Sequence, residues 1–457
     1  MSHPYIGLTR EEVTSMLLEM GLKSIDELYM DIPSRFFIKN ALQYSKPLSE
    51  EEVRRHLKII TSKNKTASQF KLFIGGGLWP HIIPSAVKEV VRRSEFLTSY
   101  TPYQPEVSQG MLQALFEYQS LMAELLDVEV VNSSMYDWAT ALGEAFRMAS
   151  RVTKRNKILY PRYISPERLK VAETYSKPSN IRLVEYLQNR VDGLADLEDL
   201  KNKIRDDTAA VYIEYPSYLG FIPTNIREIG ETAHDHNALF IIGVDPIALG
   251  IFESPGKLGA DIVVGEGQPL GMPLNFGGPL LGVMGCRMDR ELIHNLPGRL
   301  IGMTLTVKGE RAYTMILQAR EQHIKREKAT SNICTNQALC AVTAAVYLAL
   351  LGKKGIKELG EQILARTKYM INKLSRIGKV EVPLFKNIHF KEFTYRVHGV
   401  KSGEILKNLL EKKIFGGIDI GGMFNGLDDG ILTCVTEVHS REDLDYYVSS
   451  LREVVER

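Results

Sequence analysis

Two adjacent serines stand where a strand-like segment ends and a helix-like segment begins, which is a natural place to bind an anion. The strand-like segment VEVVN ends at Asn132, and Ser133 and Ser134 follow it directly. Asp137 then precedes the helical pattern, so the hydroxyls and the free N–H groups of the first helical turn could together hold a phosphate. The alternative is a plain helix cap, and the bulky Trp138 in the first turn would compete with an anion for the space.

A single carboxylate stands at the end of another strand-like segment. Asp245 closes the apolar run in IIGVDPIALG. An acid at the carboxyl end of such a strand can pair with the protonated ring nitrogen of a cofactor. Asp-Pro is also a common way for a strand to end, so this signal is weak when taken alone.

A polar loop rich in tyrosine and proline, SEFLTSYTPYQPEVSQG, runs from residue 94 to residue 110. Its prolines stiffen the loop, and Pro105 is well placed to start the next helix at its first turn. Such a loop suits a binding surface or the wall of an active site, although an ordered connector with packed tyrosines fits the pattern equally well. The candidate wall residues are Thr98, Ser99, Tyr100, Thr101, Tyr103 and Gln104.

A charged stretch, LQAREQHIKREKATSNICTNQAL, runs from residue 317 to residue 339 and turns from charged to uncharged polar before an apolar helix. A charge run is usually a solvated helix face, but a surface helix rarely ends in this way. We therefore expect a charged loop that closes over an interface. Its candidate wall residues are Lys328, Thr330, Ser331 and Asn332, and no cluster of metal-ligating residues accompanies them.

The composition is that of an ordinary globular protein of two or three domains. The chain has 457 residues, 44% apolar and 25% charged, with a net charge of +2. Because there is no basic excess, we expect neither a nucleic-acid nor a membrane partner. The start MSHPYIGLTREEV lacks signal-peptide features, and the four cysteines show no disulfide or metal spacing. We therefore expect free buried thiols and a cytoplasmic protein.

The elements that must position these residues follow an alternating pattern after about residue 70. Strands rich in valine and isoleucine alternate with amphipathic helices, of which 105–127 is the clearest, so we expect a mostly parallel sheet covered on both faces. The candidate strands are 128–132, 157–160, 181–186, 209–215, 238–245, 261–265 and 280–285.

The same pattern predicts three parts of the chain. Residues 1–64 read as an arm of short helices, residues 65–327 as a large α/β domain, and residues 328–457 as a long helix followed by a small C-terminal α+β domain. The longest apolar run, Ala338 to Gly352, falls short of the roughly 20 residues of a membrane span, so we expect a helix buried on most sides.

Taken together, several stretches resemble the P-protein, or glycine dehydrogenase (decarboxylating), family of the glycine cleavage system. The likeness extends over essentially the whole chain and is greatest to the first subunit of those enzymes that are split into two chains. It implies a pyridoxal-phosphate-dependent transferase-like fold of type I. The stretches that carry it are FLTSYTPYQPEVSQG, NSSMYDWATALGEA, GMPLNFGGPLLG, LPGRLIGMT and REQHIKREKATSNICTNQAL.

The resemblance gives meaning to Gln268 in GEGQPLGMPLNFGGP. The catalytic subunit of the family carries the cofactor lysine at this position, and an amide nitrogen is not nucleophilic enough to replace it. Ser133, Ser134, Asp137, Asp245 and Gln268 then become degenerate positions of a cofactor site, and no catalytic residue remains in this chain.

The resemblance also implies partners. A lysine-bearing second subunit would hold pyridoxal 5'-phosphate, with two copies of each chain in the assembly, and this chain would lend a wall to its active site. Glycine would lose CO2 there, and the aminomethyl group would pass to the lipoyl arm of the H-protein. Two alternatives stay open, namely a self-sufficient pyridoxal enzyme that uses Lys257 or Lys308, and a non-catalytic scaffold.

Overall fold

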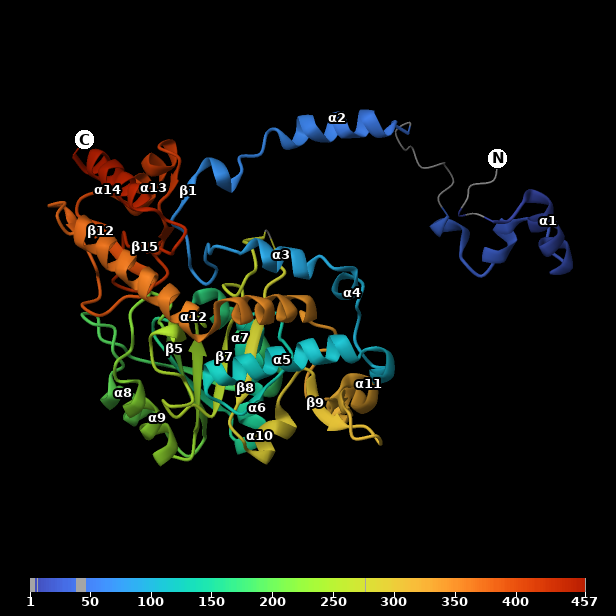
Figure 1. Ribbon diagram of the computed structural model, residues 1–457, viewed down its shortest axis with the longest axis horizontal. Helices are drawn as coiled ribbons and strands as arrows, with labels where there is room; N and C mark the ends of the chain where they lie inside the picture. Colours follow the sequence, from blue (N-terminus) through green and yellow to red (C-terminus); the bar gives the residue numbers. More distant parts are fainter. Residues whose placement is uncertain (1–4, 6, 38–46, 276, 457) are drawn as a thin grey trace. The chain divides into compact units, whose positions relative to one another are not determined.

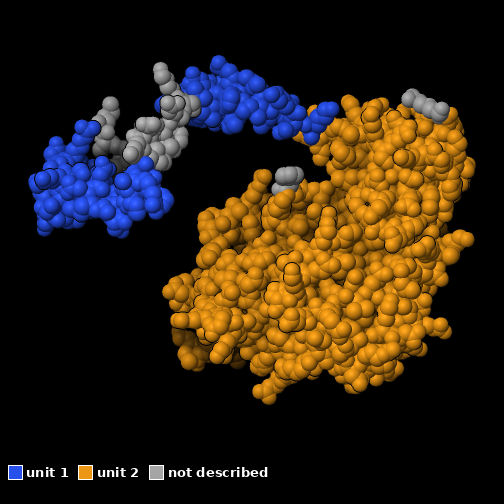
Figure 2. Space-filling model, turned by 180° about the vertical axis from the view of Figure 1, so that it is seen from behind, with its two compact units in different colours: residues 1–65 blue, residues 66–457 orange. Residues whose placement is uncertain are grey.

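The computed structural model describes residues 5, 7–37, 47–275 and 277–456. It divides into two compact units, residues 1–65 and residues 66–457, which Figure 2 distinguishes by colour. The boundaries expected at residues 64 and 327 stay a prediction.

The first unit consists of short helices with almost no core of its own. Its helices are α1 (Arg10–Glu19), η1 (Ile25–Tyr29), η2 (Ser34–Phe36) and α2 (Glu50–Thr61). Thr9 and Ser49 each form a capping box with a glutamate three residues later, which explains why these helices begin where they do. Among the described residues of this unit, Leu17 alone is buried. The predicted short helices are thus confirmed, although the second is a 3₁₀ helix.

The second unit is built on a seven-stranded sheet, and all seven predicted strands are confirmed. The strand order is β2-β8-β7-β6-β5-β3-β4, with β8 antiparallel to both of its neighbours and the remaining pairs parallel. The strands are β2 (Val130–Val131), β3 (Lys157–Pro161), β4 (Arg182–Tyr186), β5 (Thr208–Tyr215), β6 (Leu239–Val244), β7 (Ile262–Glu266) and β8 (Gly282–Cys286).

Helices cover both faces of this sheet (Figure 1). Val211 and Ile213 of β5 pack in a cluster with α5, α9 and α12, whereas Ala210 and Tyr212 pack on the opposite face with α6, α7 and α10. This alternation is what a strand buried on both sides requires. The helices are α5 (Gln109–Leu126), α6 (Trp138–Thr153), α7 (Pro166–Ser176), α8 (Leu197–Lys203), α9 (Ile226–Asp235), α10 (Arg290–Asn295) and α12 (Ala338–Leu374).

Two predicted helix boundaries are wrong. Pro105 begins a single 3₁₀ turn, η4 (Pro105–Val107), and α5 starts only at Gln109, because Ser108 leaves the helical region with φ −123°. The long helix starts at Ala338, so 329–337 is irregular rather than helical.

Helix α12 contains the predicted apolar helix and is interrupted by one glycine. Gly352 has φ 57°, a conformation that glycine adopts without strain, and it joins two helical parts. By length and composition α12 could cross a membrane, and half of its most apolar stretch is buried inside the protein. The expectation of no membrane partner stays a prediction.

The elements between the large sheet and α12 include a hairpin that the sequence pattern did not reveal. Strands β9 (Leu300–Leu305) and β10 (Arg311–Ile316) pair in an antiparallel hairpin beside α5. The shorter elements of this unit are η3 (Ala67–Gln69), α3 (Ser85–Val91), α4 (Ser94–Leu97), η5 (Lys177–Ser179), η6 (Ala248–Gly250), η7 (Gln318–Arg320), α11 (Gln322–Lys325) and η8 (Arg326–Lys328).

The C-terminal part forms the predicted α+β arrangement. A four-stranded sheet in the order β11-β12-β15-β14 packs with α13 and α14, and β1 pairs with β13 beside it. The elements are β1 (Lys71–Leu72), β11 (Val380–Glu381), β12 (Glu392–Val397), α13 (Ser402–Glu411), β13 (Ile414–Phe415), β14 (Ile418–Asp419), β15 (Ile431–Cys434) and α14 (Arg441–Glu456). The short strands β1, β13 and β14 were not predicted.

Candidate functional site

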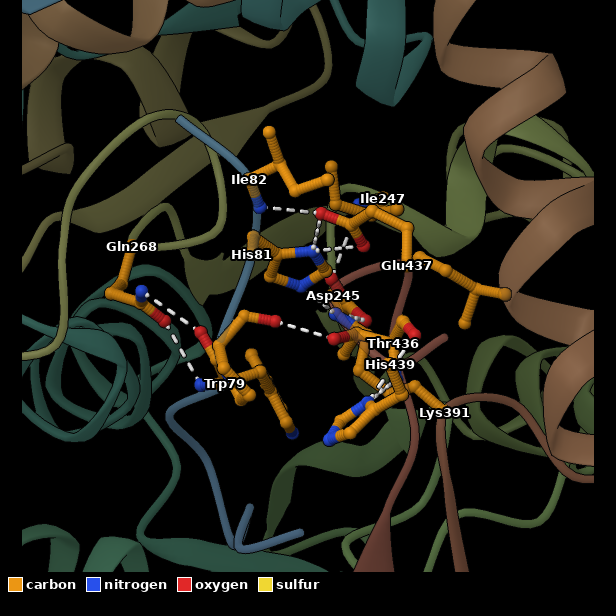
Figure 3. A network of polar contacts seen from close by, with 12 residues as sticks. Trp79, His81, Ile82, Asp245, Ile247, Gln268, Lys391, Thr436, Glu437 and His439 are labelled. Carbon is orange, nitrogen blue, oxygen red and sulfur yellow. Dashed lines mark hydrogen bonds and ion pairs between the residues drawn. The ribbon is translucent and has the colours of Figure 1, made fainter. Parts of the chain in front are cut away.

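Gln268 lies at the end of β7 and is 1% exposed. Its side-chain oxygen accepts a hydrogen bond from the backbone N–H of Trp79 at 3.0 Å. Its side-chain nitrogen donates to the carbonyl oxygens of Trp79 at 3.1 Å and Met272 at 2.8 Å. The amide therefore bonds the Trp79 backbone in both directions, as the dashed lines in Figure 3 show, and it has a structural role that a lysine could not fill.

The segment that carries Trp79 reaches the site through three consecutive glycines. A Cβ atom at Gly75 would stand 2.1 Å from a carboxylate oxygen of Glu392, so a larger residue at this position would displace that side chain. The same carboxylate accepts a hydrogen bond from the N–H of Gly76 at 2.6 Å. The glycine run thus delivers Trp79 and His81 into the space between the large sheet and the C-terminal part.

Asp245 does not face an open pocket, because Lys391 occupies its carboxylate. The ammonium of Lys391 lies 2.7 Å from Asp245 and 4.3 Å from the centre of the Trp79 ring, and both charged side chains are buried. The lysine belongs to the segment just before β12, where it adopts φ 50°. Asp245 therefore has an internal cation where the resemblance implied a cofactor ring nitrogen.

His81 and Glu437 extend this ion pair into a chain of four groups (Figure 3). The ammonium of Lys391 lies 3.0 Å from Nε2 of His81, and Nδ1 of His81 lies 2.9 Å from Glu437. An ammonium can only donate, so Nε2 accepts and the ring proton stands on Nδ1, where it donates to Glu437. Burial has the largest effect in lowering the pKa of His81, and the positive charge of Lys391 lowers it further. The histidine is therefore neutral between a cation and a carboxylate.

Trp138 fills the space on the other side of Asp245. The guanidinium of Arg168 stacks over its ring, with Cζ of Arg168 3.9 Å from the ring centre. Arg168 also forms a buried ion pair with Glu214 through two hydrogen bonds. A Cβ atom at position 243 would come within 2.7 Å of the indole, so the ring fits only because Gly243 has no side chain. Trp138 is buried, and the expectation that it competes with an anion for space at the start of the helix stays a prediction.

The N-terminus of α6 already has acceptors for its N–H groups. Asp137 caps the helix by accepting from the N–H of Thr140 at 2.7 Å. Glu266 accepts from the N–H of Trp138 at 3.3 Å, and it also accepts from the backbone N–H groups of Gln268 and Leu281. Burial raises the pKa of Glu266 to about 8. Ser133 and Ser134 precede this turn, and both are buried.

These residues do not fit pyridoxal phosphate. The amine is absent at Gln268, Asp245 is paired with Lys391, and a carboxyl group of the chain lies at the helix N-terminus. The two tryptophans and Lys391 leave a cavity of ≈ 10 Å³, which has room for about one water molecule. The degenerate site is thus filled by the chain's own side chains.

The first wall segment, residues 98–104, lies mostly at the surface. Tyr100 is 72% exposed and Tyr103 is 42% exposed. Thr335 donates to the hydroxyl of Tyr100 at 3.1 Å and shares a hydrogen bond with Thr101. Of the remaining residues, Thr98 and Gln104 are exposed and Ser99 is half-buried. The structure therefore brings this loop into contact with the polar stretch that precedes α12.

The second wall segment, residues 328–332, has two kinds of residue. Lys328 and Asn332 are exposed and Thr330 is half-buried, so they can face a partner. Ser331, in contrast, is 8% exposed and donates to buried Glu144 of α6 at 2.8 Å. Its hydroxyl holds the segment against the domain, which leaves it poorly placed to contact anything outside the chain.

Sequence reasoning missed the residues that fill the degenerate site. Lys391, His81 and Glu437 come from segments far apart in the chain, and no local motif marks them. The glycine run before Trp79 was the one available signal. Both alternative lysines, Lys257 and Lys308, are exposed.

The remaining chemical candidates are few. Of the four cysteines, three are buried as expected, but Cys334 is exposed. Within the described residues, no group of three or more histidine, cysteine, aspartate and glutamate side chains is arranged to hold a metal ion.

Comparisons with known proteins agree on one family. The family model for the glycine cleavage system P-protein matches residues 3–451. A probable glycine dehydrogenase (decarboxylating) subunit 1 from Staphylothermus marinus is 52% identical, with 99% of this chain and 98% of the relative covered. A crystal structure of glycine decarboxylase (P-protein) of the glycine cleavage system in inhibitor-bound form superposes with a TM-score of 0.88 at 35% identity, covering 99% of this chain and 100% of that one.

A more distant structure shows the fold alone. The sphingosine-1-phosphate lyase Bpss2021 of Burkholderia pseudomallei superposes with a TM-score of 0.66 at 12% identity, covering 93% of this chain and 94% of that one. The large domain therefore has the fold of type I pyridoxal-phosphate-dependent transferases, as the sequence resemblance implied.

Proposed function

This chain belongs to the glycine cleavage system P-protein family, and from that premise we propose that it is the subunit of glycine dehydrogenase (decarboxylating) that does not bind the cofactor. Family membership supports the involvement of pyridoxal phosphate in the reaction, and the name "subunit 1" of the relatives implies a second subunit. In this proposal the second subunit carries the lysine and holds the cofactor.

The observation that carries the proposal is the contrast between two regions of the same chain. The degenerate cofactor site is filled by Lys391 and two buried tryptophans, and it has no room for a substrate. The wall segments, in contrast, present exposed hydroxyl, amide and ammonium groups. A surface of this kind suits a protein that completes the active site of a neighbour.

Apolar side chains surround the first wall segment. Leu97 and Val107 flank it and are exposed, and Met303 and Leu305 are exposed on the β9–β10 hairpin that contacts η4. Exposed apolar groups next to polar loops are typical of a surface that another protein covers. The proposed assembly contains two copies of each chain, with the wall segments facing the partner's cofactor.

The proposed reaction is that of the assembled enzyme. Glycine loses its carboxylate as CO2, and the aminomethyl group passes to the lipoyl arm of the H-protein. The part of this chain is to bind and orient. Hydroxyls of residues 98–104 and the side chains of Lys328, Thr330 and Asn332 would contact the substrate or the arm and keep water away from them.

Glycine-dependent exchange of labelled CO2 tests the proposal. It is measured with the lipoylated H-protein for this chain alone, for the lysine-bearing subunit alone and for the mixture. We expect exchange only in the mixture. Exchange by this chain alone would revive the self-sufficient enzyme, and no gain on mixing would favour the scaffold.

A further inference from the structure

Arg299 is a buried cation that contacts the first wall segment and the residues just after the second. Its side chain is 5% exposed and lies just before β9. One guanidinium nitrogen donates to the hydroxyl of Tyr103 at 2.8 Å, and another donates to the carbonyl oxygen of Cys334. The same group lies 5.3 Å from the centre of the Tyr103 ring. One side chain thus links the first wall segment to the residues that follow the second.

The backbone of Arg299 is itself anchored to the large sheet. Its carbonyl oxygen accepts from the N–H of Ser133 at 2.8 Å, directly after β2. Two residues earlier, the carbonyl oxygen of Pro297 accepts from the side chain of Asn132 at 3.0 Å. The carboxylate of Glu321 lies 3.5 Å away and balances the buried charge. The arginine therefore projects from a fixed base rather than from a mobile loop.

The groups that Arg299 holds are the ones that the wall presents at the surface. Tyr103 is partly exposed, and its ring meets that of His323 edge-on at 5.6 Å between centres. Thr335, next to Cys334, donates to the exposed hydroxyl of Tyr100. Arg299 thus holds Tyr103 and Cys334 directly, and it holds Tyr100 only through the neighbouring Thr335.

We propose that Arg299 is a positioning residue, which sets the geometry of the wall that this chain presents to the active site of its partner. The inference rests on the proposed function. A planar guanidinium can donate in two directions at once while it lies near a ring, whereas a lysine ammonium is a single point of charge. R299K therefore keeps the charge beside Glu321 but cannot keep both links. Y103F keeps the ring and removes only the acceptor for one link.

The test uses the full chain assembled with its lysine-bearing subunit and the H-protein. Assembly, kcat and KM for glycine are measured for the wild type, R299K, Y103F and the double variant. R151Q is the matched control, because Arg151 is half-buried and donates to Asn295 at 3.2 Å, and neither of these hydrogen bonds reaches a wall segment. R151Q should leave kcat/KM unchanged.

We expect R299K and Y103F to assemble, and kcat/KM to fall about tenfold or more in R299K, which corresponds to the loss of one charge-assisted hydrogen bond. Because Arg299 and Tyr103 act through the same hydrogen bond, kcat/KM of the double variant should be little lower than that of R299K. The idea is overturned by wild-type kcat/KM in R299K, by additive losses in the double variant, or by an equal loss in R151Q.

The design separates this idea from the proposed function. If the wild-type mixture shows no exchange activity, the proposed function fails before any variant is compared. If R299K fails to assemble, the test of the proposal passes to Y103F, because this substitution removes only one hydroxyl from a partly exposed ring. A wild-type kcat/KM in Y103F then overturns the proposal.

Discussion

Restoring the missing lysine should not restore a cofactor site, and the structure explains why. The substitution Q268K supplies an amine at the position where the sequence resemblance places the cofactor lysine of the family's catalytic subunit. It leaves Lys391 on Asp245 and Trp138 in the adjacent space, with a cavity of ≈ 10 Å³ between them. We therefore expect Q268K to form no aldimine at position 268 with added pyridoxal phosphate.

The same substitution should destabilise the protein. The amide of Gln268 accepts from the N–H of Trp79 and donates to two carbonyl oxygens. An ammonium can donate but cannot accept, so the buried N–H of Trp79 loses its partner, at a cost of about 1–3 kcal/mol. Placing a new charge in a site that is 1% exposed adds to this cost. Q268M is the matched control, because it removes the amide but introduces no charge.

Absorbance and thermal unfolding check both parts. Wild type, Q268K and Q268M are incubated with pyridoxal phosphate, scanned for a band at about 400 nm and treated with borohydride, which reduces a Schiff base. Exposed lysines contribute the same band to all three proteins, so we expect no band in Q268K beyond that of the wild type, a lower Tm in both variants, and the lowest Tm in Q268K. A larger borohydride-sensitive band in Q268K than in the wild type, or a Tm equal to that of the wild type, would refute the argument from the filled site.

Three further outcomes follow from buried polar groups. K391M leaves the carboxylate of Asp245 buried without its cation and should lower the free energy of unfolding by about 3–5 kcal/mol. The double variant K391M/D245N removes both charges and should recover much of that loss. Urea unfolding that finds the double variant no more stable than K391M would contradict the ion-pair account. Burial raises the pKa of Glu266 from its usual 4.5 to about 8. The folded state therefore binds a proton that the unfolded state releases, so stability should fall as pH rises from about 4.5 to 8, and E266Q should flatten that slope in a series of Tm measurements. An unchanged slope would be evidence against a protonated Glu266. S331A removes the hydrogen bond to buried Glu144 and should lower the free energy of unfolding by about 1–3 kcal/mol. The variant should still assemble with the partner, as judged by the size of the complex. Loss of assembly with unchanged stability would instead place this hydroxyl at the partner surface.

Much of the fold was predictable because its signals are local. Each strand of the large sheet is a short run rich in valine and isoleucine, and each helix repeats its apolar positions at helical spacing. The capping residues Thr9 and Ser49 marked helix starts in the same way. Boundaries were less certain where two local signals conflicted. Pro105 is a good first helical residue, yet the α-helix starts at Gln109.

The candidate site was only partly predictable. The two wall segments stood out by their composition, but Arg299, which joins the first segment to the residues just after the second, belongs to neither of them. Composition likewise could not separate Ser331 from Asn332. Burial separates them, because Ser331 faces Glu144 and Asn332 faces solvent.

The sequence by itself determined that position 268 carries an amide and no amine, and a Schiff base needs an amine. Only the tertiary structure decided what became of the site. Lys391, His81 and Glu437 approach Asp245 from distant segments, and Trp79 enters behind a run of glycines. Such pairings depend on how the domains pack, and a buried charge must find its partner in space rather than in the neighbouring sequence.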